Sequence, residues 1–235
     1  MKLSSVVPWG RSLAEYRAMF ALVDEDLEAN ILGCGDGPAS FNAELTAAGG
    51  RVMSVDPIYC YSAEEIRQRI QQVYPVILAQ LARTADQYIW THFHNPGHVG
   101  SSRMSAMNQF LSDYPRGLDA GRYVEAGLPE LPFFDREFDL ALCSHLLFLY
   151  SEQLDEQQHI AALLEMCRVA TEVRVFPLVG LDGKISPHLP RVIRALAEAG
   201  HQPAVERVDY RFQKGATDML RVRSAAPINE DDTGE

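Results

Sequence analysis

Apolar runs and segments with helical spacing alternate along the chain. The apolar runs predict strands at 29–33, 51–56, 122–125, 138–143 and 172–176. Helices are expected between them, at 11–23, 38–48, 62–73, 75–88, 101–111, 151–169 and 188–199. Two further strands, 204–210 and 217–222, are expected to form a closing hairpin. This alternation predicts an α/β fold whose mostly parallel sheet is covered on both faces.

Local signals set the expected helix boundaries. Pro75 is expected to end the helix that Ser62 caps, because proline lacks the N–H that a helix interior needs. Residues 89–100 are expected to be irregular, and Ser151 is expected to cap the helix that ends at Val169. We therefore interpret residues 1–224 as one domain with a helical insert at about 57–120. The acidic tail, 225–235, is expected to be disordered.

A glycine-rich turn joins the first two predicted strands. Residues 33–37 read Gly-Cys-Gly-Asp-Gly, and the second strand ends at Asp56. Glycine lets the backbone turn sharply and approach a ligand closely. A carboxylate at the tip of the second strand can accept hydrogen bonds from both hydroxyls of a ribose. This order of strand, glycine turn, helix, strand and acid predicts half of a nucleotide-binding fold.

The glycine spacing separates two classes of cofactor. A dinucleotide fingerprint has Gly at its first, third and sixth places. Here the sixth place is Pro38, and proline has no N–H to offer a pyrophosphate. A glycine turn that does not have to bind a phosphate fits S-adenosylmethionine (SAM), an adenosine that carries a sulfonium amino acid. SAM is therefore the predicted cofactor, and a nicotinamide dehydrogenase is disfavoured.

These motifs, with Leu131-Pro132-Phe133 and Phe138-Asp139-Leu140, resemble the class I SAM-dependent methyltransferases over about 28–56 and 122–222. The resemblance implies a Rossmann-like, seven-stranded sheet and methyl transfer to oxygen or nitrogen of a small molecule. It also implies a set of cofactor contacts: Gly33, Cys34, Gly35, Asp36, Gly37, Asp56, Pro57 and Leu128. The run at 144–151, Ser-His-Leu-Leu-Phe-Leu-Tyr-Ser, further resembles a bacterial branch of the family, which implies no particular substrate.

Three positions depart from the family pattern. Ile31 stands where the family has an acid before the first glycine, and Gly127 stands where it has an acid after the third strand. Residues 177–180, Pro-Leu-Val-Gly, replace its proline-glycine-glycine turn. Adenine contacts near Leu128 are therefore expected to involve backbone groups.

Ser144 and His145 follow the fourth predicted strand, where the family's strand tip faces the reacting centre. His145 is a candidate base, and the alternative is that Ser144 caps a helix while His145 packs in the interior. Arg11 is a candidate partner for the carboxylate of the cofactor, and a surface arginine is the alternative. Tyr16 is a candidate cofactor contact and equally fits a core position.

Aromatic residues of the insert suggest a substrate wall. Tyr88, Trp90, Phe148 and Pro177 are the candidate substrate contacts, although aromatics in the insert could instead fill a small core of its own. His92, His94 and His98 have no acid or cysteine at ligand spacing, so no metal is predicted.

Bulk composition narrows the partners. The formal net charge of −11 disfavours nucleic acid. No signal core or membrane-length apolar run is seen, and the four cysteines are scattered, so a cytoplasmic protein with reduced thiols is expected. A small-molecule substrate and a homodimer are the partners considered.

Two other functions stay open at this point. The scaffold is similar to azetidine-2-carboxylate synthases, in which the amine of SAM attacks its own γ-carbon and methylthioadenosine leaves. The third hypothesis is a SAM-binding protein without catalysis.

Overall fold

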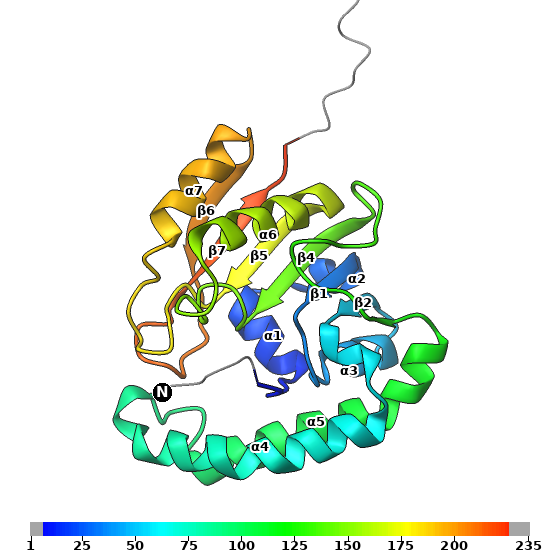
Figure 1. Cartoon of the computed structure of the whole chain (residues 1–235), viewed down its shortest axis with the longest axis vertical. Helices are drawn as coiled ribbons and strands as arrows, with labels where there is room; N and C mark the ends of the chain where they lie inside the picture. Colours follow the sequence, from blue (N-terminus) through cyan, green and yellow to red (C-terminus); the bar gives the residue numbers. More distant parts are fainter. Residues whose placement is uncertain (1–6, 226–235) are drawn as a thin grey trace, which may run out of the picture.

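The computed structural model describes residues 7–225 (Figure 1). Its strands form one seven-stranded sheet of order β3-β2-β1-β4-β5-β7-β6. The strands are β1 (Asn30–Cys34), β2 (Arg51–Val55), β3 (Tyr123–Val124), β4 (Phe138–Ser144), β5 (Ala170–Phe176), β6 (Gln202–Arg207) and β7 (Asp218–Arg223). Strands β1 to β5 pair in parallel, and β7 is antiparallel to both β5 and β6. The predicted α/β class and the terminal hairpin are confirmed.

The helices cover both faces of this sheet. They are α1 (Leu13–Phe20), α2 (Asp24–Glu28), α3 (Phe41–Ala47), α4 (Ala63–Arg83), α5 (Pro96–Asp119), α6 (Glu156–Val169) and α7 (Leu189–Glu198), with 3₁₀ turns η1 (Pro57–Cys60) and η2 (Ala85–Gln87). Ile31 packs with Phe20 and Phe41 on the α1 and α3 face, whereas Leu32 packs with Leu163 on the α6 and α7 face. Because successive strand residues point to opposite faces, both sets are buried and the strands read as continuous apolar runs.

The order of the strands reverses between β1 and β4. From β1 the chain proceeds outward to β2 and β3, and it then returns to β4 on the other side of β1. The loops after β1 and β4 therefore leave in opposite directions and open a crevice at the carboxyl ends of the strands.

Helices α4 and α5 lie side by side across this edge of the molecule (Figure 1). With η1 and η2 they fill the connection between β2 and β3. A third hydrophobic cluster lies beneath them and includes Tyr59, Ile66, Ile70, Phe110 and Tyr114. The aromatic residues of this segment thus build packing of their own as well as contacts with the sheet. None of the helices in the described range is both long and apolar enough to cross a membrane.

Several expected helix boundaries are wrong, in α3, α4, α5 and α6. Helix α4 continues through Pro75 to Arg83. Pro75 and Gln71 are exposed, so water can bond the carbonyl that proline leaves unpaired, while Ile70 and Ile77 hold the opposite face in the core.

Helix α5 is longer than expected at both ends. It begins at Pro96, capped by the Asn95 side chain, so the second half of the segment expected to be irregular is helical. It ends at Asp119 because the exposed Pro115 is also accommodated. Helix α6 is capped by Asp155 instead of Ser151, whose hydroxyl donates to the Phe148 carbonyl at 2.6 Å. Helix α3 begins at Phe41, three residues after Pro38. The tail after residue 225 lies outside the described residues.

A buried ion pair fastens α5 to the rest of the fold. The Arg103 guanidinium is fully buried and contacts the carboxylate of Glu15 on α1. The Tyr210 hydroxyl, before β7, donates to the same carboxylate at 2.7 Å. Burial alone would raise the pKa of Glu15, but the adjacent Arg103 charge lowers it below its usual value. Three segments far apart in the chain therefore meet at one charge pair.

Removing one partner of this pair should be costly. We expect Arg103→Met to lower the free energy of unfolding by about 3–5 kcal/mol, because Glu15 would stay buried without its counter-charge. The double variant Arg103→Met with Glu15→Gln should recover part of that loss, since no charge is then left unpaired. Urea denaturation of the three proteins measures both values. Equal stability of Arg103→Met and the parent would contradict this account.

Candidate functional site

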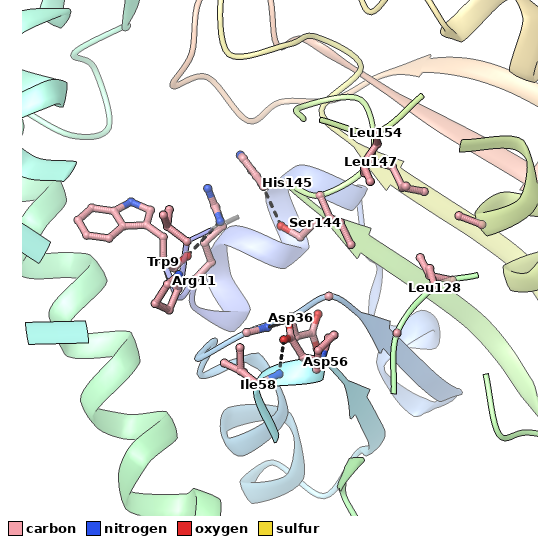
Figure 2. A pocket seen from close by; sticks show the side chains of 18 of the residues that line it. Trp9, Arg11, Asp36, Asp56, Ile58, Leu128, Ser144, His145, Leu147 and Leu154 are labelled. Carbon is pink, nitrogen blue, oxygen red and sulfur yellow. Dashed lines mark hydrogen bonds between the residues drawn. The ribbon is translucent and has the colours of Figure 1, made fainter. Parts of the chain in front are cut away.

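A cavity of about 330 Å³ opens at the reversal point of the sheet (Figure 2). Ligand pockets are typically about 300–1,000 Å³, so the cavity can take a cofactor-sized molecule. Its wall comes from α1 and the segment before it, the turns after β1 and β2, the loop after β3, and the stretch from the end of β4 into α6. The lining residues include Trp9, Arg11, Tyr16, Gly35, Asp36, Gly37, Asp56, Pro57, Ile58, Gly127, Leu128, Ser144, His145, Leu147 and Leu154.

The glycine turn holds conformations that side chains disfavour. Gly35 and Gly37 have φ values of +70° and +56°. The Gly35 N–H donates to the Val55 carbonyl at 2.8 Å, which ties the turn to the end of β2. A Cβ atom at Gly33 would overlap the Asp36 carboxylate, so the turn folds back on the strand only because this position has no side chain.

Asp56 is held in place by the backbone. Its Oδ2 accepts from the Gly37 N–H at 2.8 Å, and its Oδ1 accepts from the Ile58 N–H at 2.9 Å. Each carboxylate oxygen can accept a second hydrogen bond, and two hydroxyls on neighbouring carbons can supply both. Burial raises the pKa of Asp56, although the two N–H groups oppose this effect. This pair of acceptors fits the two hydroxyls of a ribose.

Asp36 is a second buried acid in the same wall. Its carboxylate accepts hydrogen bonds from the Tyr16 hydroxyl at 2.7 Å and from the Ser54 hydroxyl at 2.6 Å. Burial raises the pKa of Asp36 to about 6, even though both hydroxyls favour the charged form. This difference corresponds to roughly 3 kcal/mol against the ionised carboxylate. A cation in the cavity would offset that cost.

Arg11 supplies the opposite charge. Its Nη1 donates to the Trp9 carbonyl at 3.1 Å, while its Nε is buried without a hydrogen-bond partner in residues 7–225. Burial, and next the nearby Arg103, lower the pKa of Arg11 to about 10, so it stays cationic at neutral pH. The structure pairs it with no carboxylate in the described range. Arg11 extends from beside Trp9 toward His145 (Figure 2).

Ser144 and His145 stand at the tip of β4. The Ser144 Oγ and the His145 Nδ1 are 3.0 Å apart, and the His145 N–H donates to the Phe176 carbonyl at 2.7 Å. His145 has a φ of +56°, a strained value for a side-chain-bearing residue. Burial, and next the charges of Arg11 and Arg103, lower the pKa of His145 well below its usual value. Its ring is therefore neutral at pH 7 and is a weak base.

Not every predicted site residue reaches this cavity. Gly33 and Cys34 lie inside β1, behind the turn, and Cys34 is fully buried. Tyr88 lines a smaller neighbouring cavity. The predicted contacts Trp90, Phe148 and Pro177 line neither of these cavities. Trp90 donates from its indole to the Ala85 carbonyl at 2.8 Å.

The other two are held in the interior. Phe148 is fully buried and its N–H donates to His159 at 3.0 Å. Pro177 follows β5 and is also buried.

Other lining residues were missed by the sequence reasoning. Trp9, Ile58, Leu147 and Leu154 form much of the apolar wall. Ile58 and Leu147 each lie three residues after a strand end, a position that could have identified them. Trp9 and Leu154 have no such signal, because they are brought in by the folding of connecting segments. Residues 7–225 contain no group of three or more metal-ligating side chains.

Comparison with solved structures assigns the fold of this chain. No family model matches the chain. The mitomycin 7-O-methyltransferase MmcR is structurally similar, with a TM-score of 0.51 and 15% identity, over 91% of this chain and 54% of that one. The chain has the class I methyltransferase fold. Its sheet order and its cavity at the reversal point agree with that assignment.

Two further proteins show how far the likeness extends. The uncharacterized protein MJ0045 of Methanocaldococcus jannaschii is 29% identical over 224 residues, which are 95% of this chain and 98% of that protein. The 1,6-didemethyltoxoflavin-N1-methyltransferase of Burkholderia thailandensis has a TM-score of 0.48 and 14% identity, over 91% of this chain and 79% of that one.

The hydrogen bonds at Asp36 give a direct test of this site. We expect Ser54→Ala to raise the pKa of Asp36 from about 6 to about 7 or higher, because the charged form loses one of its two hydroxyl donors. NMR titration of the carboxyl carbon measures the value. Ser62→Ala, at the exposed start of α4, is the matched control and should leave it unchanged. A pKa that stays near 6 in Ser54→Ala would show that this bond does not form.

Proposed function

We propose that this chain is a SAM-dependent methyltransferase that acts on a small molecule. The observation that carries the proposal is the cavity at the sheet reversal, where a glycine turn lies beside an Asp56 carboxylate that the backbone orients. The class I methyltransferase fold supports the same conclusion. The net charge of −11 favours a small substrate over a nucleic acid.

The lining residues divide according to the parts of the cofactor they can hold. Ile58, Leu128 and Leu147 offer an apolar wall for the adenine, and Asp56 offers acceptors for the ribose hydroxyls. Asp36 and Arg11 offer opposite charges for the ammonium and carboxylate of the amino-acid end. Each of these charges lacks an ionic partner in the described protein, so a zwitterionic ligand would supply both counter-charges.

When bound, SAM supplies an electrophilic methyl group. The protein's part is to hold a nucleophile in line with that group at a separation of about 3–3.5 Å and to exclude water. Ser144 and His145, at the tip of β4, are the residues we assign to the nucleophile's position. His145 orients it by hydrogen bonding, because one ring nitrogen of a neutral imidazole donates a hydrogen bond and the other accepts one.

The ribose contact can be tested by removing its acceptor. We expect Asp56→Ala to weaken SAM binding by about 1–3 kcal/mol, since two hydroxyls lose a charged acceptor. Isothermal titration calorimetry measures the affinity, and Glu64→Ala, on the exposed start of α4, is the control that should bind normally. Unchanged affinity in Asp56→Ala, or saturation by NADH in place of SAM, would overturn the proposal.

In the parent, product analysis should find S-adenosylhomocysteine; methylthioadenosine would indicate cyclisation, and binding without turnover would indicate a non-catalytic role.

Asp36 makes SAM binding depend on pH. Its pKa of about 6 means that it becomes neutral as pH falls below 6, and a cationic ligand prefers the ionised form. We therefore expect the affinity for SAM to fall by up to tenfold per pH unit below about 6 and to level off above it. Calorimetry between pH 5 and 8 measures this, and Asp36→Asn should bind more weakly at pH 8 with a flatter profile. A parent profile that is flat across this range would exclude the contact.

A further inference from the structure

A second cavity, of about 90 Å³, adjoins the first. The two share Val7, Trp9, Arg11 and His145, so these residues form the partition between them. The rest of the second wall consists of Ile77, Leu81, Tyr88, Val99, Leu149, Tyr150, Leu181, Phe212 and Gln213. A molecule in this cavity would meet a ligand of the first cavity beside Arg11 and His145.

The wall of the second cavity comes from helices and connecting segments outside the sheet. Ile77 and Leu81 come from α4 and Val99 from α5, while Leu149 follows β4 and Phe212 precedes β7. The buried pair of Arg103 and Glu15 joins α5 to α1, and Tyr210 joins the segment before β7 to the same carboxylate. These contacts tie α5 and the segment before β7 to α1.

The lining is mostly apolar, with the polar groups of Tyr88, Tyr150, Gln213 and His145 and one charged side chain. Arg11 is the single charged side chain among the lining residues within the described range, and no carboxylate lies there. An ammonium would be repelled by Arg11 and would find no counter-ion. A carboxylate would compete for Arg11 with the anionic end of the cofactor in the first cavity. The remaining surface, with Tyr88 and Phe212 rings 4.7 Å apart, favours an uncharged apolar ligand.

Size limits the ligand further. An apolar cavity of about 150 Å³ holds benzene, so about 90 Å³ accommodates little more than part of one six-membered ring, with the rest at the partition. At the partition, the His145 Nδ1 is engaged by Ser144, which leaves Nε2 as the ring nitrogen to meet a ligand. No carboxylate is among the described residues that line the second cavity, so it offers no anionic base to deprotonate an alcohol, whereas a neutral amine is nucleophilic without first losing a proton.

We propose that the second cavity is the acceptor site and that it takes a compact, uncharged, largely apolar molecule whose nucleophile is a neutral nitrogen presented at the partition beside His145. This rests on the proposed function, because the methyl donor is the ligand of the first cavity. The nitrogen lone pair forms the new N–C bond while the S–C bond breaks and its electron pair stays on sulfur. The nitrogen gains a positive charge, and any proton it then carries leaves to His145 or water.

A series of single-ring probes tests the chemistry. Aniline and phenol are uncharged at pH 7, benzylamine is a cation and benzoate is an anion. With the protein loaded with S-adenosylhomocysteine, calorimetry should show aniline binding at least tenfold more tightly than benzylamine or benzoate. With SAM, mass spectrometry should detect N-methylaniline. A preference for either charged probe, methylation confined to phenol, or no binding of any probe would overturn the assignment.

Two matched substitutions test the location. Val99 is fully buried in the second wall, whereas Val76 is 56% exposed on the outer side of α4. Val99→Phe should weaken aniline binding at least tenfold and change the affinity for S-adenosylhomocysteine less than twofold, and Val76→Phe should change neither. Leu81→Phe is a second filling variant if Val99→Phe folds poorly.

The results separate the two proposals. Normal S-adenosylhomocysteine binding with aniline affinity unaffected in both filling variants would overturn the acceptor site and leave the methyltransferase proposal intact. Failure of the parent to bind SAM or S-adenosylhomocysteine would overturn both.

Discussion

The reversal of strand order between β1 and β4 is the constraint on which the site depends. Two parallel strands that end at the same edge send their chains in opposite directions, so the backbone cannot close over that edge. Gly35, Asp36, Ser144 and His145 all lie just beyond these two strand ends or at them. The chemistry of the cavity is therefore concentrated where parallel pairing leaves space.

Two charged side chains in that space, Asp36 and Arg11, form no ion pair within residues 7–225. The pKa of Asp36 is raised to about 6 and that of Arg11 is lowered to about 10, both first by burial. Elsewhere in the fold, Arg103 and Glu15 show the usual solution, in which a buried charge has a direct partner. Asp36 and Arg11 have no direct ionic partner in residues 7–225, so burial opposes the charged form of each.

The connection between β2 and β3 contains two long helices, α4 and α5. A simple crossover would need one helix, but here α4 and α5 run across the carboxyl edge and carry the outer wall of the second cavity. Their attachment is partly polar, through Arg103, and partly aromatic, through rings such as Tyr59 and Phe110, whose centroids lie 6.0 Å apart. The same helices thus close the fold and shape the space beside His145.

The sequence by itself determined the order of elements, the fold class and the core of the first cavity. Periodicity identifies buried strands, and the Gly33 to Gly37 turn with Asp56 identifies the edge of the sheet where the first cavity lies, because both signals are local. It failed at Pro75, where burial of the opposite helix face outweighs a missing hydrogen bond. Its candidate substrate contacts Phe148 and Trp90 line neither cavity. Only the tertiary structure decided that Trp9 and Leu154 line the first cavity and that Val99 and Phe212 meet in the second. Those contacts join segments distant in the chain, and packing between distant segments leaves no periodic or spacing pattern in the sequence.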